Sequence, residues 1–151
     1  MQFSAWEDRA DVAGIALPPP RHASDGEVAA LWIGPRRWLL VAREGSGLLQ
    51  RVSGEAGVFV DQSEGRTVLR LSGVSAREVL AKGTGIDLDA SACGAGSCAA
   101  TLLAHVGVVL HAANADTFDL YVPRSYGLHI WEWLHEAASV EGLRVERADH
   151  G

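Results

Sequence analysis

The stretch DQSEGRTVLRLSGVSAREVLAKGTGIDL, which runs from Asp61 to Leu88, decides the fold that the sequence predicts. Thr67, Leu69 and Leu71 share one face of an alternating pattern that ends at Ser72. A period of two residues is typical of a strand that buries one of its faces. We therefore expect a half-buried strand at the centre of this stretch.

A helix is predicted immediately after that strand. The hydroxyl of Ser75 is placed to accept a hydrogen bond from the amide of Glu78, and the Glu78 carboxylate to bond back, as in a capping box. Val74 and Val79 have the spacing of a hydrophobic staple across the start of the helix. Gly83 can adopt the left-handed backbone that commonly ends a helix. The stretch thus predicts a strand, a turn and a capped helix, without an obvious nucleophile, base or ligand cluster.

The rest of the chain carries similar patterns of apolar residues. They predict strands over residues 30–33, 38–42, 58–61, 98–104, 106–111, 118–122 and 143–145, and a short helix over 46–53. Gly34 and Pro35 mark a hairpin turn between the first two strands, and Gly107 marks a bulge or tight bend. The order β-β-α-β-β-α, then β-β-β-α, indicates an α+β fold: an antiparallel or mixed sheet with helices packed on it, in two β-β-α-type halves.

The longest predicted helix runs from Tyr126 to about Ser139, after a possible cap at Ser125. One stripe of this helix should face the sheet because its residues recur with the helical period. The stripe consists of Tyr126, Ile130, Trp133, Leu134 and Ala137.

Large side chains outside that stripe are our candidates for contact with another protein. Leu128, Trp131 and His135 lie beside the stripe, and a broad core could also absorb Trp131. Phe3 and Trp6 stand in a weakly patterned N-terminal region, where they belong either to a docking arm or to a disordered end. These five residues are the interface candidates.

The sequence predicts one principal domain, since 151 residues is an ordinary single-domain length. Residues 1–27 are expected to form an extended or partly disordered arm, because Pro18, Pro19 and Pro20 exclude a helix there. Residues 28–147 are expected to form the domain, and residues 148–151 a tail.

Composition disfavours two classes of partner. The net charge is −6, and Lys82 is the only lysine, so a broad surface for nucleic acid is not expected. We find no apolar stretch near the ~20 residues of a membrane helix and no secretory signal. The expectation is therefore a cytoplasmic protein that binds neither nucleic acid nor membranes.

No familiar catalytic or nucleotide-binding motif is present. Cys93, Cys98, His105 and His111 could supply zinc ligands, but their spacing is tighter than that of zinc fingers, so we favour no metal site. The remaining candidates are polar residues in predicted turns, where solvation or bonding to the backbone is usual. They are Asp61, Glu64, Arg66, Asp87 and Asp89.

Four segments together resemble the gamma subunit of heterotetrameric sarcosine oxidase. They are WIGPRRWLLV (32–41), SEGRTVLRLSGVSAREVLAKGTGIDL (63–88), SCAATLLAHVGVVLH (97–111) and DTFDLYVPRSYGLHIWEWL (116–134). Each motif is loose, but their order and spacing are fairly specific. The resemblance implies a fold related to the folate-binding domain of aminomethyltransferases of the glycine cleavage type.

The same resemblance implies partners and cofactors. In that family the alpha subunit carries NAD and a folate site, the beta subunit carries FAD and FMN, and a small delta subunit binds zinc. The complex demethylates sarcosine oxidatively to glycine, makes hydrogen peroxide and can pass the one-carbon unit to tetrahydrofolate. The gamma subunit has no known catalytic residue, so the resemblance assigns no catalytic, cofactor-binding or metal residue here.

The sequence supports three hypotheses about the function. The first is a non-catalytic, structural subunit of a complex that oxidises sarcosine or a related N-methyl amine. The second is a stand-alone folate-binding or aminomethyl-transfer protein. The third is a small metal-binding module built on the cysteines and histidines named above.

Overall fold

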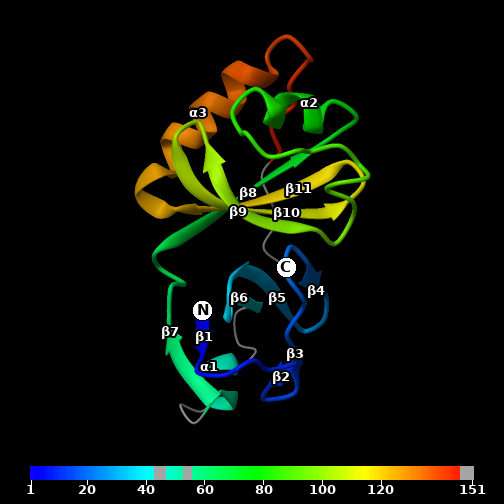
Figure 1. Ribbon diagram of the computed structural model, residues 1–151. Helices are drawn as coiled ribbons and strands as arrows, with labels where there is room; N and C mark the ends of the chain where they lie inside the picture. The colour runs from blue at the N-terminus through cyan, green and yellow to red at the C-terminus, as the bar shows by residue number, and fades with distance from the viewer. Residues whose placement is uncertain (43–46, 53–55, 147–151) are drawn as a thin grey trace.

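Figure 1 shows the protein, a computed structural model that describes residues 1–42, 47–52 and 56–146, as two stacked lobes. The N-terminal lobe contains β1–β7 and α1, and the C-terminal lobe contains β8–β11, α2, η2 and α3. The strands are β1 Gln2–Ala5, β2 Asp11–Val12, β3 Ile15–Ala16, β4 Ala23–Ser24, β5 Val28–Gly34, β6 Arg37–Ala42, β7 Gly57–Val60, β8 Arg66–Ser72, β9 Cys98–Leu103, β10 Val106–Asn114 and β11 Thr117–Pro123. The helices are α1 Leu48–Arg51, α2 Ala76–Ala81, the 3-10 turn η2 Arg124–Tyr126 and α3 Gly127–Ala138.

The N-terminal lobe is built on a five-stranded antiparallel sheet in the order β4-β5-β6-β1-β7. The hairpin predicted at Gly34 and Pro35 is confirmed as β5 and β6. Strand β1 inserts between β6 and β7, so Phe3 lies opposite Trp38 on one side and Phe59 on the other. The first residues of the chain therefore form an interior strand of the sheet.

This placement corrects the prediction of an arm over residues 1–27. Strands β1 to β4 all lie in that region, and Phe3 is completely buried. Its ring stacks on Phe59 and Trp38, with centroids 4.5 and 6.0 Å away. The chain divides instead near residues 61–65, which join the two lobes, and not near residue 27. The predicted tail at 148–151 lies outside the described residues.

The C-terminal lobe is built on a four-stranded antiparallel sheet in the order β8-β11-β10-β9. Helices α2 and α3 cover one face of it (Figure 1). The half-buried strand predicted around residues 67–72 is confirmed as β8: Leu69 and Leu71 pack against the core, and Val68 and Arg70 are exposed on the other face. Antiparallel sheets covered by a few helices confirm the α+β class.

The two lobes meet through the uncovered face of the four-stranded sheet. A small apolar cluster joins them, formed by Leu31 and Leu39 from the N-terminal lobe and by Cys98, Val109 and Tyr121 from the C-terminal lobe. We call this cluster the seam.

The helix at residues 76–81 forms where the sequence predicts it, but for different reasons. Ser75 is its N-cap, yet no side-chain capping bond is present there in the described structure. Val74 is 88 % exposed, so the predicted staple with Val79 is wrong. Gly83 does not adopt the left-handed backbone. A Cβ at Gly83 would instead lie 2.3 Å from Cζ2 of Trp133, so glycine is needed to let α3 approach.

A Gly83→Ala substitution should therefore destabilise the protein by about 1–3 kcal/mol, because the added methyl group overpacks the contact with Trp133. Urea unfolding measures this loss. Gly85→Ala is the matched control, since a Cβ there meets no described atom within 4 Å. A second change, Trp133→Leu, should reduce the cost of Gly83→Ala; equal costs in both backgrounds would contradict the explanation.

Several other details differ from the sequence prediction. Gly107 pairs regularly within β10, and the chain turns at Ala104 and His105, whose φ angles are 48° and 66°. Tyr126 is exposed because it ends η2 and precedes α3. Residues 143–145 are irregular and exposed. The short helix predicted over 46–53 covers four residues as α1, while residues 46 and 53 lie outside the described structure.

Candidate docking surface

Helix α3 is held on the sheet through one face and through its C-terminal end. Ile130 and Leu134 are buried, and Trp133 and Ala137 are partly buried against the core, which confirms the predicted inner stripe except for Tyr126. The ammonium group of Lys82 donates a 2.7 Å hydrogen bond to the carbonyl oxygen of Ala137. A cation at the last turn also favours the helix dipole. The orientation of α3 is thus fixed, and so is the face that it turns outward.

The outward face of α3 carries large apolar groups in water. Leu128 is 68 % exposed and Trp131 is 40 % exposed. They are three residues apart, and the exposed His135 follows four residues later, so the three share one face of the helix. We call Leu128, Trp131 and His135 the α3 outer face. The partial exposure of Trp131 favours the prediction of a contact surface over the alternative that the core absorbs it.

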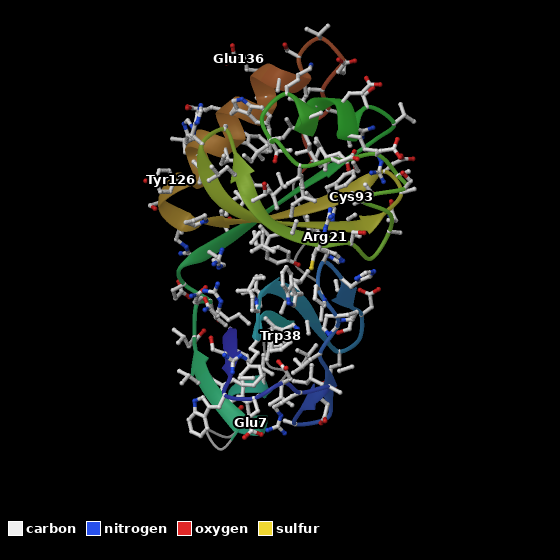
Figure 2. All side chains as sticks on the ribbon, viewed as in Figure 1. Glu7, Arg21, Trp38, Cys93, Tyr126 and Glu136 are labelled. Atoms are coloured by element: carbon white, nitrogen blue, oxygen red, sulfur yellow. The ribbon has the colours of Figure 1, made fainter. Side chains whose placement is uncertain are left out.

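Two features border the α3 outer face. Tyr126 is half exposed at the start of the helix, and Figure 2 shows it at the opposite end of α3 from Glu136. Glu132 and Glu136 are both exposed beside the apolar residues. An apolar centre with polar residues around it is the usual composition of a protein interface.

The two N-terminal candidates do not join this surface. Phe3 belongs to the core of the N-terminal lobe, so its prediction as an interface residue is wrong. Trp6 is 61 % exposed directly after β1, and its carbonyl oxygen accepts a 2.8 Å hydrogen bond from Arg36. Trp6 and α3 therefore belong to different lobes, and Trp6 stays a separate candidate (Figure 1).

The possible metal ligands form no common cluster among the described residues, although Cys98 and His111 are cross-strand partners on β9 and β10. Cys93 and Cys98 are buried free thiols, His105 is exposed at the β9–β10 turn, and His111 is buried in β10. Within the part of the chain that the structure describes, no group of three or more His, Cys, Asp or Glu side chains could hold a metal ion.

The acidic residues in turns bind their own backbone. Oδ1 of Asp61 accepts bonds from the amide and hydroxyl of Ser63, at 2.9 and 2.6 Å. The hydroxyl, and then the amide, lower the pKa of Asp61. Asp89 makes the same pair of bonds with Ser91. Asp87 accepts from the amide of Asp89, and Glu64 forms an exposed ion pair with Arg124. Asp61, Asp87 and Asp89 thus bond to the backbone of their turns, and Glu64 is solvated, as the sequence alternative holds.

One polar arrangement has no counterpart in the sequence predictions. Arg70 and Asp119 are cross-strand partners on β8 and β11, and the guanidinium donates two hydrogen bonds, of 2.7 and 2.8 Å, to the carboxylate. Asp119 is buried, although its place in an alternating strand indicates a polar outer face. Only the pairing of β8 with β11 could reveal this bond, because 49 residues separate the two side chains.

No helix in the described residues has both the length and the apolar character needed to cross a membrane.

Comparison with known proteins places these features in a family. Residues 10–141 match the model of the sarcosine oxidase gamma subunit family. The chain is 36 % identical to the sarcosine oxidase subunit gamma of Arthrobacter sp over 119 residues, which are 76 % of this chain and 58 % of that protein. It is 33 % identical to the subunit gamma of Corynebacterium sp. (strain U-96) over 137 residues, which are 86 % of this chain and 67 % of that protein.

A solved structure agrees with these relatives. A chain of the heterotetrameric sarcosine oxidase from Corynebacterium sp. U-96, in complex with pyrrole 2-carboxylate, superimposes with a TM-score of 0.82 and 27 % identity. The similarity covers 96 % of this chain and 83 % of that one. The protein belongs to the sarcosine oxidase gamma subunit family.

Proposed function

We propose that this protein is a small, non-catalytic subunit of a heterotetrameric, sarcosine oxidase-type flavoenzyme. Its role is to pack against a larger subunit and to support the assembly. The family match and the similarity to a chain of a heterotetrameric sarcosine oxidase support this proposal. The observation that carries it is the α3 outer face, where a tryptophan and a leucine are exposed on a helix whose inner face is already buried.

The chemistry then belongs to the partners. We propose alpha, beta and delta subunits that hold NAD, FAD, FMN, tetrahydrofolate and zinc. The complex would demethylate sarcosine or a related N-methyl amine oxidatively, with transfer of the one-carbon unit to tetrahydrofolate, in the cytoplasm.

Purification from the native source tests the proposal directly. A tag on this chain should recover three further subunits in equal amounts, together with flavin absorbance and sarcosine-dependent production of hydrogen peroxide. The isolated chain should show neither flavin nor turnover. Recovery of a lone chain that binds tetrahydrofolate tightly would instead support a stand-alone folate protein and contradict the proposal.

A further inference from the structure

A line of four side chains crosses the four-stranded sheet at the seam. Cys98 on β9 pairs with His111 on β10, His111 pairs with Asp119 on β11, and Asp119 pairs with Arg70 on β8. Residues directly opposite each other on neighbouring strands point to the same side of a sheet. Because Cys98 belongs to the seam, His111 lies on the face that meets the N-terminal lobe.

His111 is poorly suited to carry a charge in this position. Its side chain is buried, and Nδ1 has no hydrogen-bond partner among the residues that the structure describes. Both oxygens of the neighbouring Asp119 already accept bonds from Arg70. A proton added at Nδ1 would create a buried donor without an acceptor, which is costly.

The charges around His111 change the size of its pKa shift but do not reverse the lowering that burial causes. Burial is the largest influence and lowers the pKa of His111; Asp119 and then Asp25 raise it, and Arg70 lowers it further. Cys98 and Tyr121 stay neutral between pH 5 and 8, because burial raises their pKa values to about 11 and about 12. The titratable and charged groups around His111 are thus Arg70, Asp119, Tyr121 and Cys98 on the same face of the sheet, and Asp25 on the N-terminal side.

The contact beside His111 joins the lobes directly. The sulfur of Cys98 lies 2.9 Å from the carbonyl oxygen of His22 and 3.3 Å from that of Trp32, both in the N-terminal lobe. The amide of Cys98 donates a 2.9 Å bond to the carbonyl oxygen of Arg21. Any opening of the seam must break these bonds and expose the thiol.

We propose that His111 makes the junction between the two lobes acid-sensitive: the neutral imidazole keeps the seam closed, and uptake of one proton loosens it. The direction of the pH dependence follows from the difference between the pKa of His111 in the closed seam and its pKa when exposed. The pKa of His111 in the folded chain lies below its ordinary value near 6.5, so the stabilisation is complete above about pH 6.5 and declines as the pH falls through the folded pKa. Most carboxylates titrate lower, near pH 4, so histidines are the side chains whose ordinary pKa lies between pH 7 and 5. The chain has six histidines, so substitution of His111 is needed to separate its effect from that of the others.

The thiol of Cys98 can report on the seam. The chain has two cysteines, so Cys93→Ala leaves Cys98 as the only thiol. The rate at which this thiol reacts with 4,4′-dithiodipyridine is measured in the folded chain and in the urea-unfolded chain at the same pH. The unfolded rate divided by the folded rate gives a protection factor. We expect this factor to fall several-fold between pH 7 and pH 5. His111→Gln should abolish the fall, because the amide does not titrate in this range.

His105→Asn is the matched control. It removes an exposed histidine from the same hairpin and suits the left-handed backbone at φ 66°. This variant should keep the acid-dependent loss of protection. The same loss in His111→Gln would overturn the proposal.

A direct titration keeps the proposal testable if His111→Gln does not fold. Proton NMR of the wild-type chain gives the pKa of each histidine ring, and His111 should titrate below pH 6.5. A value at or above 6.5 would overturn the proposal, whatever the variant does.

Discussion

A Trp131→Asp variant is expected to lose at least tenfold, and up to about a hundredfold, of its affinity for the partner subunits, while its stability stays close to that of the wild type. Tryptophan is the residue type most often responsible for binding energy at the centre of an interface. Trp131 is 40 % exposed in the isolated chain, so an aspartate there can remain in water. In the complex the same carboxylate would be buried without a partner, which costs at least the ~1.4–2.8 kcal/mol that a ten- to hundredfold loss of affinity corresponds to.

Two measurements separate binding from folding. Isothermal titration calorimetry with the remaining subunits gives the affinity, and urea unfolding of the isolated chain gives the stability. Val74→Asp is the matched control, because it adds the same charge to an 88 % exposed valine in the same lobe, between β8 and α2 and outside the α3 outer face. It should bind like the wild type. Trp131→Phe should recover part of the affinity, since it restores an aromatic ring.

Two other results would contradict this prediction. If Trp131→Asp unfolds in isolation, the indole contributes to the core in spite of its exposure. If the variant is stable and binds normally, the α3 outer face is not the docking surface, and the family assignment alone would remain.

Phe3→Ala is expected to have the opposite pattern: a loss of about 3–5 kcal/mol in the free energy of unfolding, as for other fully buried phenylalanines. Phe3 has no exposed surface and stacks on Phe59 and Trp38. Removing its ring leaves a cavity between three strands of the N-terminal lobe. The measurement is the midpoint of urea unfolding, followed by the fluorescence of the tryptophans.

Trp6→Ala is the control for this prediction. It truncates an aromatic residue three positions along the chain that is 61 % exposed, so it should change the stability by less than about 1 kcal/mol. A small effect of Phe3→Ala, or a large effect of Trp6→Ala, would show that the N-terminal strand does not occupy the place described for β1.

Local patterns determined most of the elements of this protein. The alternation in residues 67–72 and the Gly34-Pro35 turn predict β8 and the β5–β6 hairpin correctly, and the helical period predicts the inner face of α3. These signals are readable because each element buries one side, and the period of the apolar residues follows from the geometry of its own backbone. The exposure of Leu128 and Trp131 follows from the same geometry, since they lie outside the buried stripe.

Contacts between distant segments were decided only by the tertiary structure. Phe3 is buried because β1 pairs with β6 and β7, and nothing in the first residues indicates that pairing. Gly83 is required by Trp133, and Asp119 is buried because Arg70 lies opposite it. The sequence predicts only that His111 belongs to a strand, and its position at the seam is evident only from the pairing of β9 with β10. The sequence by itself determines which face of a helix or strand is apolar. Which element packs against that face depends on pairing between segments tens of residues apart, and the local pattern of apolar residues carries no information about that pairing.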